Sequence, residues 1–250
     1  MTPPEISGII FVCMFLGAIV GIWLQGVLPD HHLSPENKDL VKLGAGLIGT
    51  MAALLLGLLV ASAKSSYDAS GTEVTAMAAN LVLLDRGLAH YGPEASDIRG
   101  LLKIAVAQTV DQLWSKEDAA RARELPAPAM REVFDKLQQL EPHSGAQRAL
   151  QSDAESVVID IGKIRLLLLA QNGTSVSAVF LVVVVFWLAL LFVSFGLFAP
   201  RNTTAIVTLL LAAISVAAAF FLMLELECPF SGLIQVSSTP LRNAIAVLGG

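Results

Sequence analysis

The residues that could do chemistry gather in the segment Leu224–Asn243, LELECPFSGLIQVSSTPLRN, which begins at the end of the last long apolar run. Glu225 and Glu227 offer carboxylates that can accept hydrogen bonds or attract cations. Pro229 then ends the helix, because proline has no amide hydrogen and clashes with the preceding turn. We interpret the segment as a structural joint, against the alternative of an ordinary polar helix end. Its five key residues, called the exit motif below, are Glu225, Glu227, Pro229, Phe230 and Gly232.

A short helix is expected after this joint. Ser238 or Thr239 can cap a helix that opens at Pro240, since proline is favoured at the first helical position. Leu241, Ile245 and Leu248 would share one face of it. The segment therefore turns away from the apolar run and folds back as an amphipathic element.

Catalytic patterns are missing from the sequence. It contains no Gly-rich phosphate loop, no GxSxG elbow, no HExxH and no Cys-x-x-Cys. The adjacent His31 and His32 have only Asp30 as a further ligand nearby, so a solvated loop is the better interpretation than a metal site. Asp85-Arg86 could form a buried ion pair, although a solvated helix face is the commoner outcome. The residues predict no enzyme, no cofactor and no metal site.

The composition points to a membrane protein. Hydrophobic residues make up 55% of the 250-residue chain, charged residues only 15%, and the mean hydropathy is +0.69. The net charge of -5 argues against binding nucleic acid, which needs a basic surface. Stretches of about 20 apolar residues are long enough to cross a bilayer. Four such spans are predicted: Ser7–Leu28, Leu43–Ala63, Val176–Phe198 and Thr203–Leu226.

No charged residue lies well inside any of these spans. Pumps and proton-coupled carriers normally keep such a residue at membrane depth, so a transporter of that kind is disfavoured. A passive pore remains open, because its walls can be backbone, hydroxyl and apolar groups.

Small residues recur along the second span. They let another backbone approach closely, and in lipid such packing drives helix association. A four-residue step drifts by about 40° around a helix, so the stripe wraps around the span. Packing within one subunit and packing between subunits both remain open. The stripe consists of Ala45, Gly49, Ala53, Gly57 and Ala61, and the first span adds the pair Gly17 and Gly21.

The region between the second and third spans is predicted to be helical. A heptad-like seam of Val74, Met77, Leu81, Leu84 and Leu88 precedes a Gly92-Pro93 break. Residues 115–128 are charged and contain proline, so they are predicted to form a loop. The fold class is thus an all-α integral membrane protein, with a helix pair over 1–63, a helical domain over 64–174, a second helix pair over 175–226 and the exit joint with a short helix over 227–250.

The exit segment carries a family resemblance. Leu224–Gly232 followed by Pro240-Leu241-Arg242 resembles the signature of the bacterial bestrophin-like domain family, and the order of two spans, a helical domain and two spans agrees with it. Leu84-Asp85-Arg86 and Tyr91-Gly92-Pro93-Glu94 are similar to that family's pattern after the second span. More distantly, the exit motif resembles a segment of true bestrophins, which are pentameric ion channels with cytosolic helical domains.

The calcium site of those bestrophins is not implied here. Their acidic cluster follows the last span, whereas Pro229-Phe230 is followed by Ser231, Gly232, Leu233 and Ile234, with no acid before the chain ends. Calcium requires six to eight oxygen ligands, which this segment cannot supply by itself.

The resemblance implies an oligomeric pore for small ions, formed by a ring of copies of this chain such as a pentamer and lined by the second span. Bestrophin-type channels are narrowed by apolar side chains there, and the candidates are Thr50, Leu54 and Leu58, one turn apart on one face. The alternative is a non-conducting membrane scaffold or sensor whose helical domain binds a protein partner.

The expected location is the inner (plasma) membrane. With four spans, both termini and the central domain share one side. The basic residues near the membrane on that side are Lys64, Lys163, Arg165 and Arg242, against Lys38, Lys42 and Arg201 on the other. The positive-inside rule therefore favours, by a small margin, a cytoplasmic domain and cytoplasmic termini.

Overall fold

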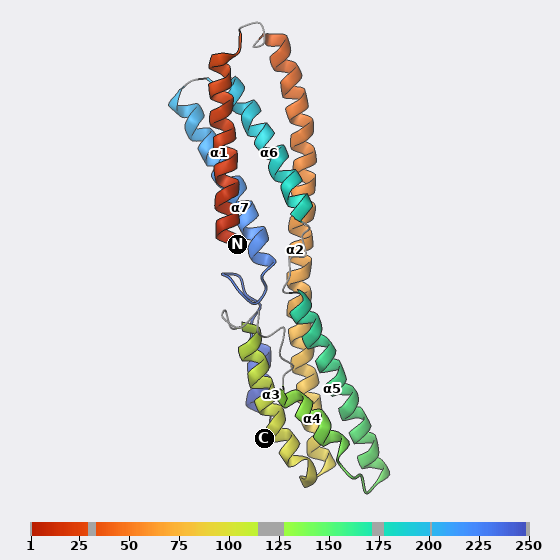
Figure 1. Ribbon diagram of the computed structural model, residues 1–250. Coiled ribbons are helices and arrows are strands. Elements are labelled where there is room, and N and C mark those ends of the chain that lie inside the picture. Colours follow the sequence, from red (N-terminus) through yellow and green to blue (C-terminus); the bar gives the residue numbers. More distant parts are fainter. Residues whose placement is uncertain (1, 30–33, 115–127, 172–177, 201, 249–250) are drawn as a thin grey trace. The chain divides into compact units, whose positions relative to one another are not determined.

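The computed structural model describes residues 2–29, 34–114, 128–171, 178–200 and 202–248. Within these residues every regular element is a helix (Figure 1), so the predicted all-α fold is confirmed. The chain divides into two compact units. Unit 1 comprises Met1–Ser65 and Thr174–Glu227, and unit 2 comprises Ser66–Gly173 and Cys228–Gly250. The paired histidines, Arg201 and residues 115–127 of the predicted loop lie outside the described residues.

Helices α1, α2, α6 and α7 are long and apolar enough to cross a membrane. They span Pro3–Val27, Pro35–Tyr91, Ala178–Phe198 and Thr203–Leu226. Each contains one of the four predicted spans over its described residues, except that α1 ends one residue before Leu28. Helix α2 runs for 57 residues without interruption. The expected border at residues 63 and 64 therefore falls inside a continuous helix, because no proline occurs between Pro35 and the Gly92-Pro93 break.

In unit 1, α1 packs against α6 and α7 (Figure 1). Met14 and Ala18 of α1 share a buried cluster with Phe192 of α6 and Phe220 of α7. Gly21 makes the closest approach: a Cβ added there would meet the Val193 carbonyl oxygen and lie 2.7 Å from the Leu197 nitrogen. The Gly17 and Gly21 pair therefore serves packing within one protomer, since only glycine lets these two backbones meet.

Unit 2 is a helical domain built around the second half of α2. Its further elements are the 3-10 helix η2 at Pro93–Ala95 and helices α3 at Ser96–Trp114, α4 at Pro128–Gln138, α5 at Gly145–Gln171 and α8 at Thr239–Val247. The seam predicted on α2 is buried, and it joins residues of the other helices in one core. That core includes Val74, Met77, Leu81, Leu84, Leu88, Ile98, Leu102, Val133, Leu137, Ile161, Leu168 and Leu241.

Helix α8 begins where the sequence predicts. Ser238 is the N-cap residue and Pro240 lies in the first turn, but the hydroxyl that accepts the Thr239 amide belongs to Ser237, at 3.2 Å. Leu241 and Leu248 are buried in the core of unit 2. The Lys103 ammonium of α3 donates to the Leu248 carbonyl at 3.4 Å, which fixes the end of the helix.

Candidate functional site

Within unit 1, helix α2 has one packed face and one open face. Ala52, Leu59 and Ala63 are buried. The open face carries large apolar side chains spaced three or four residues apart, the period of one side of a helix. These exposed residues are Leu40, Leu43, Leu47, Met51, Leu54 and Leu58.

The predicted gate residues all lie on the open side. Leu54 is 77% exposed and Leu58 65%, and Thr50 is exposed as well. The Thr50 hydroxyl donates to the Leu47 carbonyl of its own helix at 2.8 Å, so it needs no partner from a neighbouring helix. In the protomer this stretch is an apolar surface with one hydroxyl. Such a surface must be covered by lipid or by a second protein surface, or it must face the lumen of an assembly.

The small-residue stripe is divided between two surroundings. A Cβ placed on Gly49 would lie 3.7 Å from Leu191 Cδ1 of α6, whereas one placed on Gly57 would meet nothing within 4 Å. Ala53 and Ala61 are exposed, and Ala45 is half-buried. A four-residue step carries the stripe around the helix, and only its first part packs inside the protomer. A packing role for Ala53, Gly57 and Ala61 stays a prediction.

The exit motif begins at the end of α7. Helix α7 closes at Leu226 with Glu227 as its C-cap. The residues Glu225 and Glu227 are 3% and 8% exposed. Both carboxylates belong to unit 1, and Pro229, Phe230 and Gly232 belong to unit 2. Gly232 has a φ of 113°, a backbone conformation that glycine adopts without strain.

Pro229–Val236 is a closed loop on unit 2. The Val236 amide donates to the Pro229 carbonyl at 2.7 Å. The Trp114 indole donates to the Val236 carbonyl at 2.8 Å, and the Tyr67 hydroxyl donates to the Gln235 carbonyl at 3.1 Å. The buried Phe230 ring meets the Trp114 ring edge-on, with 5.0 Å between centroids. The loop is therefore held from two helices, which fits the predicted structural joint.

Sequence reasoning did not identify Trp114 or Tyr67 as part of this site. Both are amphipathic aromatics, which combine a large apolar contact with one polar group. The sequence signal that could have indicated them is the residue type itself. A Trp or Tyr that packs in a helical core still needs a hydrogen-bond acceptor for its N–H or O–H group, and here backbone carbonyls of the loop supply it.

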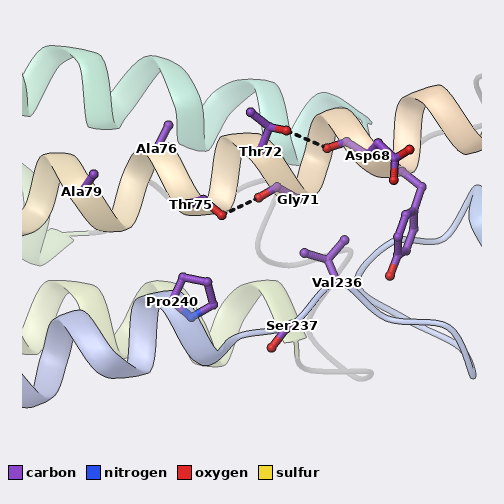
Figure 2. A pocket seen from close by; sticks show the side chains of 10 residues that line it. Asp68, Gly71, Thr72, Thr75, Ala76, Ala79, Val236, Ser237 and Pro240 are labelled. Atoms are coloured by element: carbon purple, nitrogen blue, oxygen red, sulfur yellow. Dashed lines mark hydrogen bonds between the residues drawn. The ribbon is translucent and has the colours of Figure 1, made fainter.

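A groove of about 770 Å³ lies beside this loop (Figure 2). One wall is α2, with Asp68, Thr72 and Thr75, and the other is formed by Val236, Ser237 and Pro240. Figure 2 shows the two threonine hydroxyls bonded to their own helix: Thr72 donates to the Asp68 carbonyl and Thr75 to the Gly71 carbonyl, each at 3.0 Å. The groove is thus lined largely by small side chains, and these two hydroxyls already bond to the backbone of their own helix. Across the described ranges, no three His, Cys, Asp or Glu side chains come together as a metal site would need.

Asp85 pairs with Arg99 rather than with its neighbour Arg86. The Arg99 Nε and an outer guanidinium nitrogen donate to the two Asp85 oxygens at 2.8 and 3.0 Å. Arg86 is exposed, because consecutive helix positions point about 100° apart. The hydrogen bond to Asp85 raises the pKa of Arg99 above its ordinary value. The Asp85–Arg86 pair considered from the sequence does not form: Arg86 is solvated, as the sequence favoured, whereas Asp85 is buried and its cation comes from α3.

The Tyr91-Gly92-Pro93-Glu94 pattern makes this pairing possible. Gly92 has a φ of 131°, and Pro93 opens η2, so the chain reverses between α2 and α3. Tyr91 is buried, and this burial, with Glu94 nearby, raises the pKa of its hydroxyl. The residues that carry the family resemblance here are structural: they form the turn that sets Arg99 against Asp85.

Residues 12–241 match the model of the bestrophin-like domain. Crystal structures of similar fold include mutant forms of a bacterial bestrophin homolog from Klebsiella pneumoniae. One is 15% identical, with a TM-score of 0.69 and 95% of each chain covered. Another is 14% identical, with a TM-score of 0.67 and 96% of each chain covered.

Comparison with curated proteins found no match. The structural similarity to the solved structures shows a shared fold, and at such low sequence identity it shows the fold alone. The family match extends over nearly the whole chain, from inside α1 to the start of α8, and it includes the Asp85 turn and the exit motif. The chain therefore belongs to the bestrophin-like domain family.

Proposed function

We propose that copies of this chain assemble into a ring that forms a passive membrane pore for small ions, with α2 lining it. The observation that carries the proposal is the open apolar face of α2, on which Leu54 and Leu58 are the most prominent side chains near the middle of the span. True bestrophins, which the chain resembles, are ion channels that are narrowed at this helix. Family membership makes a channel more plausible than an enzyme.

The chemistry of that face suits a dewetting gate. A ring of leucines leaves an entering ion without water and offers it no polar replacement, so conduction can stop without complete closure. Thr50, one turn before Leu54, would supply a ring of hydroxyl oxygens on the outer side of the constriction. Selectivity then depends on ring width and on these hydroxyls, because the span contains no charge well inside it.

Unit 2 supports the assembly into a homo-oligomer. Apolar side chains that are exposed in a protomer can be buried between the copies of an oligomer. Unit 2 exposes several large apolar side chains, among them Leu83, Ile104, Ile159, Leu166, Leu167 and Leu233. A ring of copies, a pentamer by the resemblance to bestrophins, would cover such surfaces between neighbours. We propose the inner membrane as its site, with unit 2 and both termini in the cytoplasm.

The pore is tested by shortening its constriction. Leu54→Ala and Leu58→Ala, reconstituted in lipid bilayers, are expected to pass more current than the wild type, since each removes a ring of isobutyl groups from the narrowest part. Leu54→Ser should conduct more still, because it offers ions a hydroxyl. Single-channel recording or liposome flux measures the effect.

Leu211→Ala is the matched control. Leu211 is also an exposed leucine on a span, but it lies on α7. Its truncation should leave conductance at the wild-type level. If the wild type and every α2 variant assemble correctly and remain electrically silent, the pore is wrong. The chain is then better explained as a scaffold or sensor whose unit 2 binds a protein partner.

A further inference from the structure

A further cavity, this one in unit 1, lies between the start of α2 and the end of α6. Its volume is about 480 Å³, and Gly46, Gly49, Leu191 and Phe195 are among its apolar walls. The space exists because the two glycines have no side chains to fill it. A Cβ on Gly46 would meet nothing within 4 Å, and one on Gly49 would meet only Leu191. We call this cavity the α2–α6 groove.

Among the described residues, the ionisable groups that line the groove are two lysines. Lys38 and Lys42 stand one turn apart near the start of α2, and both line the cavity. The Lys38 ammonium lies 5.9 Å from the centroid of the Phe198 ring, a cation–π distance, so the side chain is held over the end of α6. The groove therefore has a cationic mouth and an apolar body.

The charge at this mouth is only partly neutralised. Lys42 forms an ion pair with Asp39 at 3.1 Å, but both side chains are well exposed, and such pairs contribute little. Asp39 is not part of the groove lining. An anion at the mouth would thus meet two ammonium groups and, in the part of the lining that the structure describes, no carboxylate.

The mouth also lies at the ends of two membrane-spanning candidates. Helix α2 begins at Pro35 and α6 ends at Phe198, so Lys38 and Lys42 stand where lipid headgroups are expected. The rise of an α-helix puts Gly49 about 10 Å deeper than Lys42, within the reach of an acyl chain. A free phosphate would use only the lysines, and an uncharged apolar molecule only the walls.

We propose that the α2–α6 groove binds an anionic phospholipid of the surrounding bilayer. Its phosphate lies between Lys38 and Lys42, and one acyl chain runs along Gly46 and Gly49 against Leu191 and Phe195. A second copy of this chain fits the groove less well, since a protein surface pressed onto the mouth would have to desolvate both ammonium groups. The site is independent of whether α2 lines a conducting pore.

Native mass spectrometry of the purified protein with added lipid tests this site. The probes are dioleoyl phosphatidylglycerol, which is anionic, and dioleoyl phosphatidylcholine, which has the same chains and no net charge. The wild type is expected to retain more of the anionic lipid. Lys38→Gln and Lys42→Gln should each weaken its binding about fivefold and leave the zwitterionic lipid unaffected. The double variant Lys136→Gln/Arg148→Gln removes two positive charges from unit 2 and should change neither.

A second variant tests the apolar body. Gly46→Leu fills the groove from a position with open space around its Cβ, so we expect it to fold and to lose both lipids. Gly44→Leu is its control, because Gly44 has equally open surroundings and does not line the groove.

Three outcomes would overturn the site. The first is equal retention of the two lipids by the wild type. The second is competition by sn-glycerol 3-phosphate as strong as that by the anionic lipid, and the third is a Gly46→Leu variant whose oligomer dissociates although the wild type holds no lipid. The last two would assign the groove to a soluble phosphate and to a second copy of the chain, respectively.

Discussion

Asp85 and Arg99 make a two-point ion pair inside unit 2. The Asp85 side chain is 8% exposed and that of Arg99 21%. A bidentate guanidinium–carboxylate pair fixes both angle and distance, so it orients α3 against α2 as well as stabilising the contact. The neighbouring Arg86, though part of the same family pattern, points outward. Asp85, which belongs to the family pattern, is thus on α2, and Arg99, which completes the ion pair, is on α3.

Removing one member of this pair should be costly. Asp85→Ala removes the carboxylate that accepts two hydrogen bonds from the largely buried Arg99 guanidinium, and we expect a loss of about 2–4 kcal/mol in the stability of unit 2. Arg86→Ala should cost less than about 0.5 kcal/mol, because its side chain is solvated. Thermal unfolding in detergent compares the two. Equal midpoints for both variants would show that the pair contributes nothing net to stability.

At the scale of the helix, glycine has two different functions in unit 1. On α1, Gly21 lets the backbone of α6 come into contact, and Gly196 of α6 does the same from the other side. On α2, the glycines leave space: Gly46 and Gly49 open a groove, and Gly57 faces outward. The same residue type therefore allows close contact in one helix pair and leaves space in another. The difference lies in the partner backbone, which no single helix specifies.

Adding one methyl group separates these functions. Gly21→Ala should separate α1 from α6, because the new Cβ overlaps backbone atoms that cannot rotate away, and we expect at least about 1–3 kcal/mol of destabilisation. Gly8→Ala, on the same helix with nothing within 4 Å, should be neutral or slightly stabilising. The measurement is the thermal midpoint together with the fraction of correctly assembled protein. A stable Gly21→Ala variant would contradict the close α1–α6 packing.

At the scale of the whole molecule, the spans decide which segments share a side of the membrane. Four crossings, one by each of α1, α2, α6 and α7, would place the start of α2 and the end of α6 on one side, and unit 2 with both termini on the other. Basic residues favour the cytoplasm for unit 2 by a small margin only, so orientation deserves its own test.

Cysteine labelling checks that orientation. In a background without Cys13 and Cys228, we expect Glu36→Cys to react with an impermeant maleimide on intact cells. Glu141→Cys should react only after the membrane is permeabilised. Both positions are exposed glutamates in the protomer, so reactivity reports the side of the membrane. Labelling of Glu141→Cys alone from outside would place unit 2 on the outer side.

The sequence by itself determined the features that depend on local pattern. A run of about 20 apolar residues is long enough to cross a bilayer, so the four candidate spans were predictable, although the continuation of α2 beyond its span was not. The period of Val74, Met77, Leu81, Leu84 and Leu88 was sufficient to predict a buried seam. The Gly92-Pro93 break and the proline at the exit from α7 follow from backbone chemistry.

Tertiary structure decided every feature that depends on two distant segments. Arg99 reaches Asp85 only because the turn at Gly92 reverses the chain, and Trp114 reaches Val236 from another helix. The lysine-mouthed groove exists because α6 ends beside the start of α2. Helical periodicity says which residues share a face, but not which neighbour that face meets. Which faces meet depends on the packing of the whole chain, because a close-packed interior has room for only one arrangement of side chains at each contact.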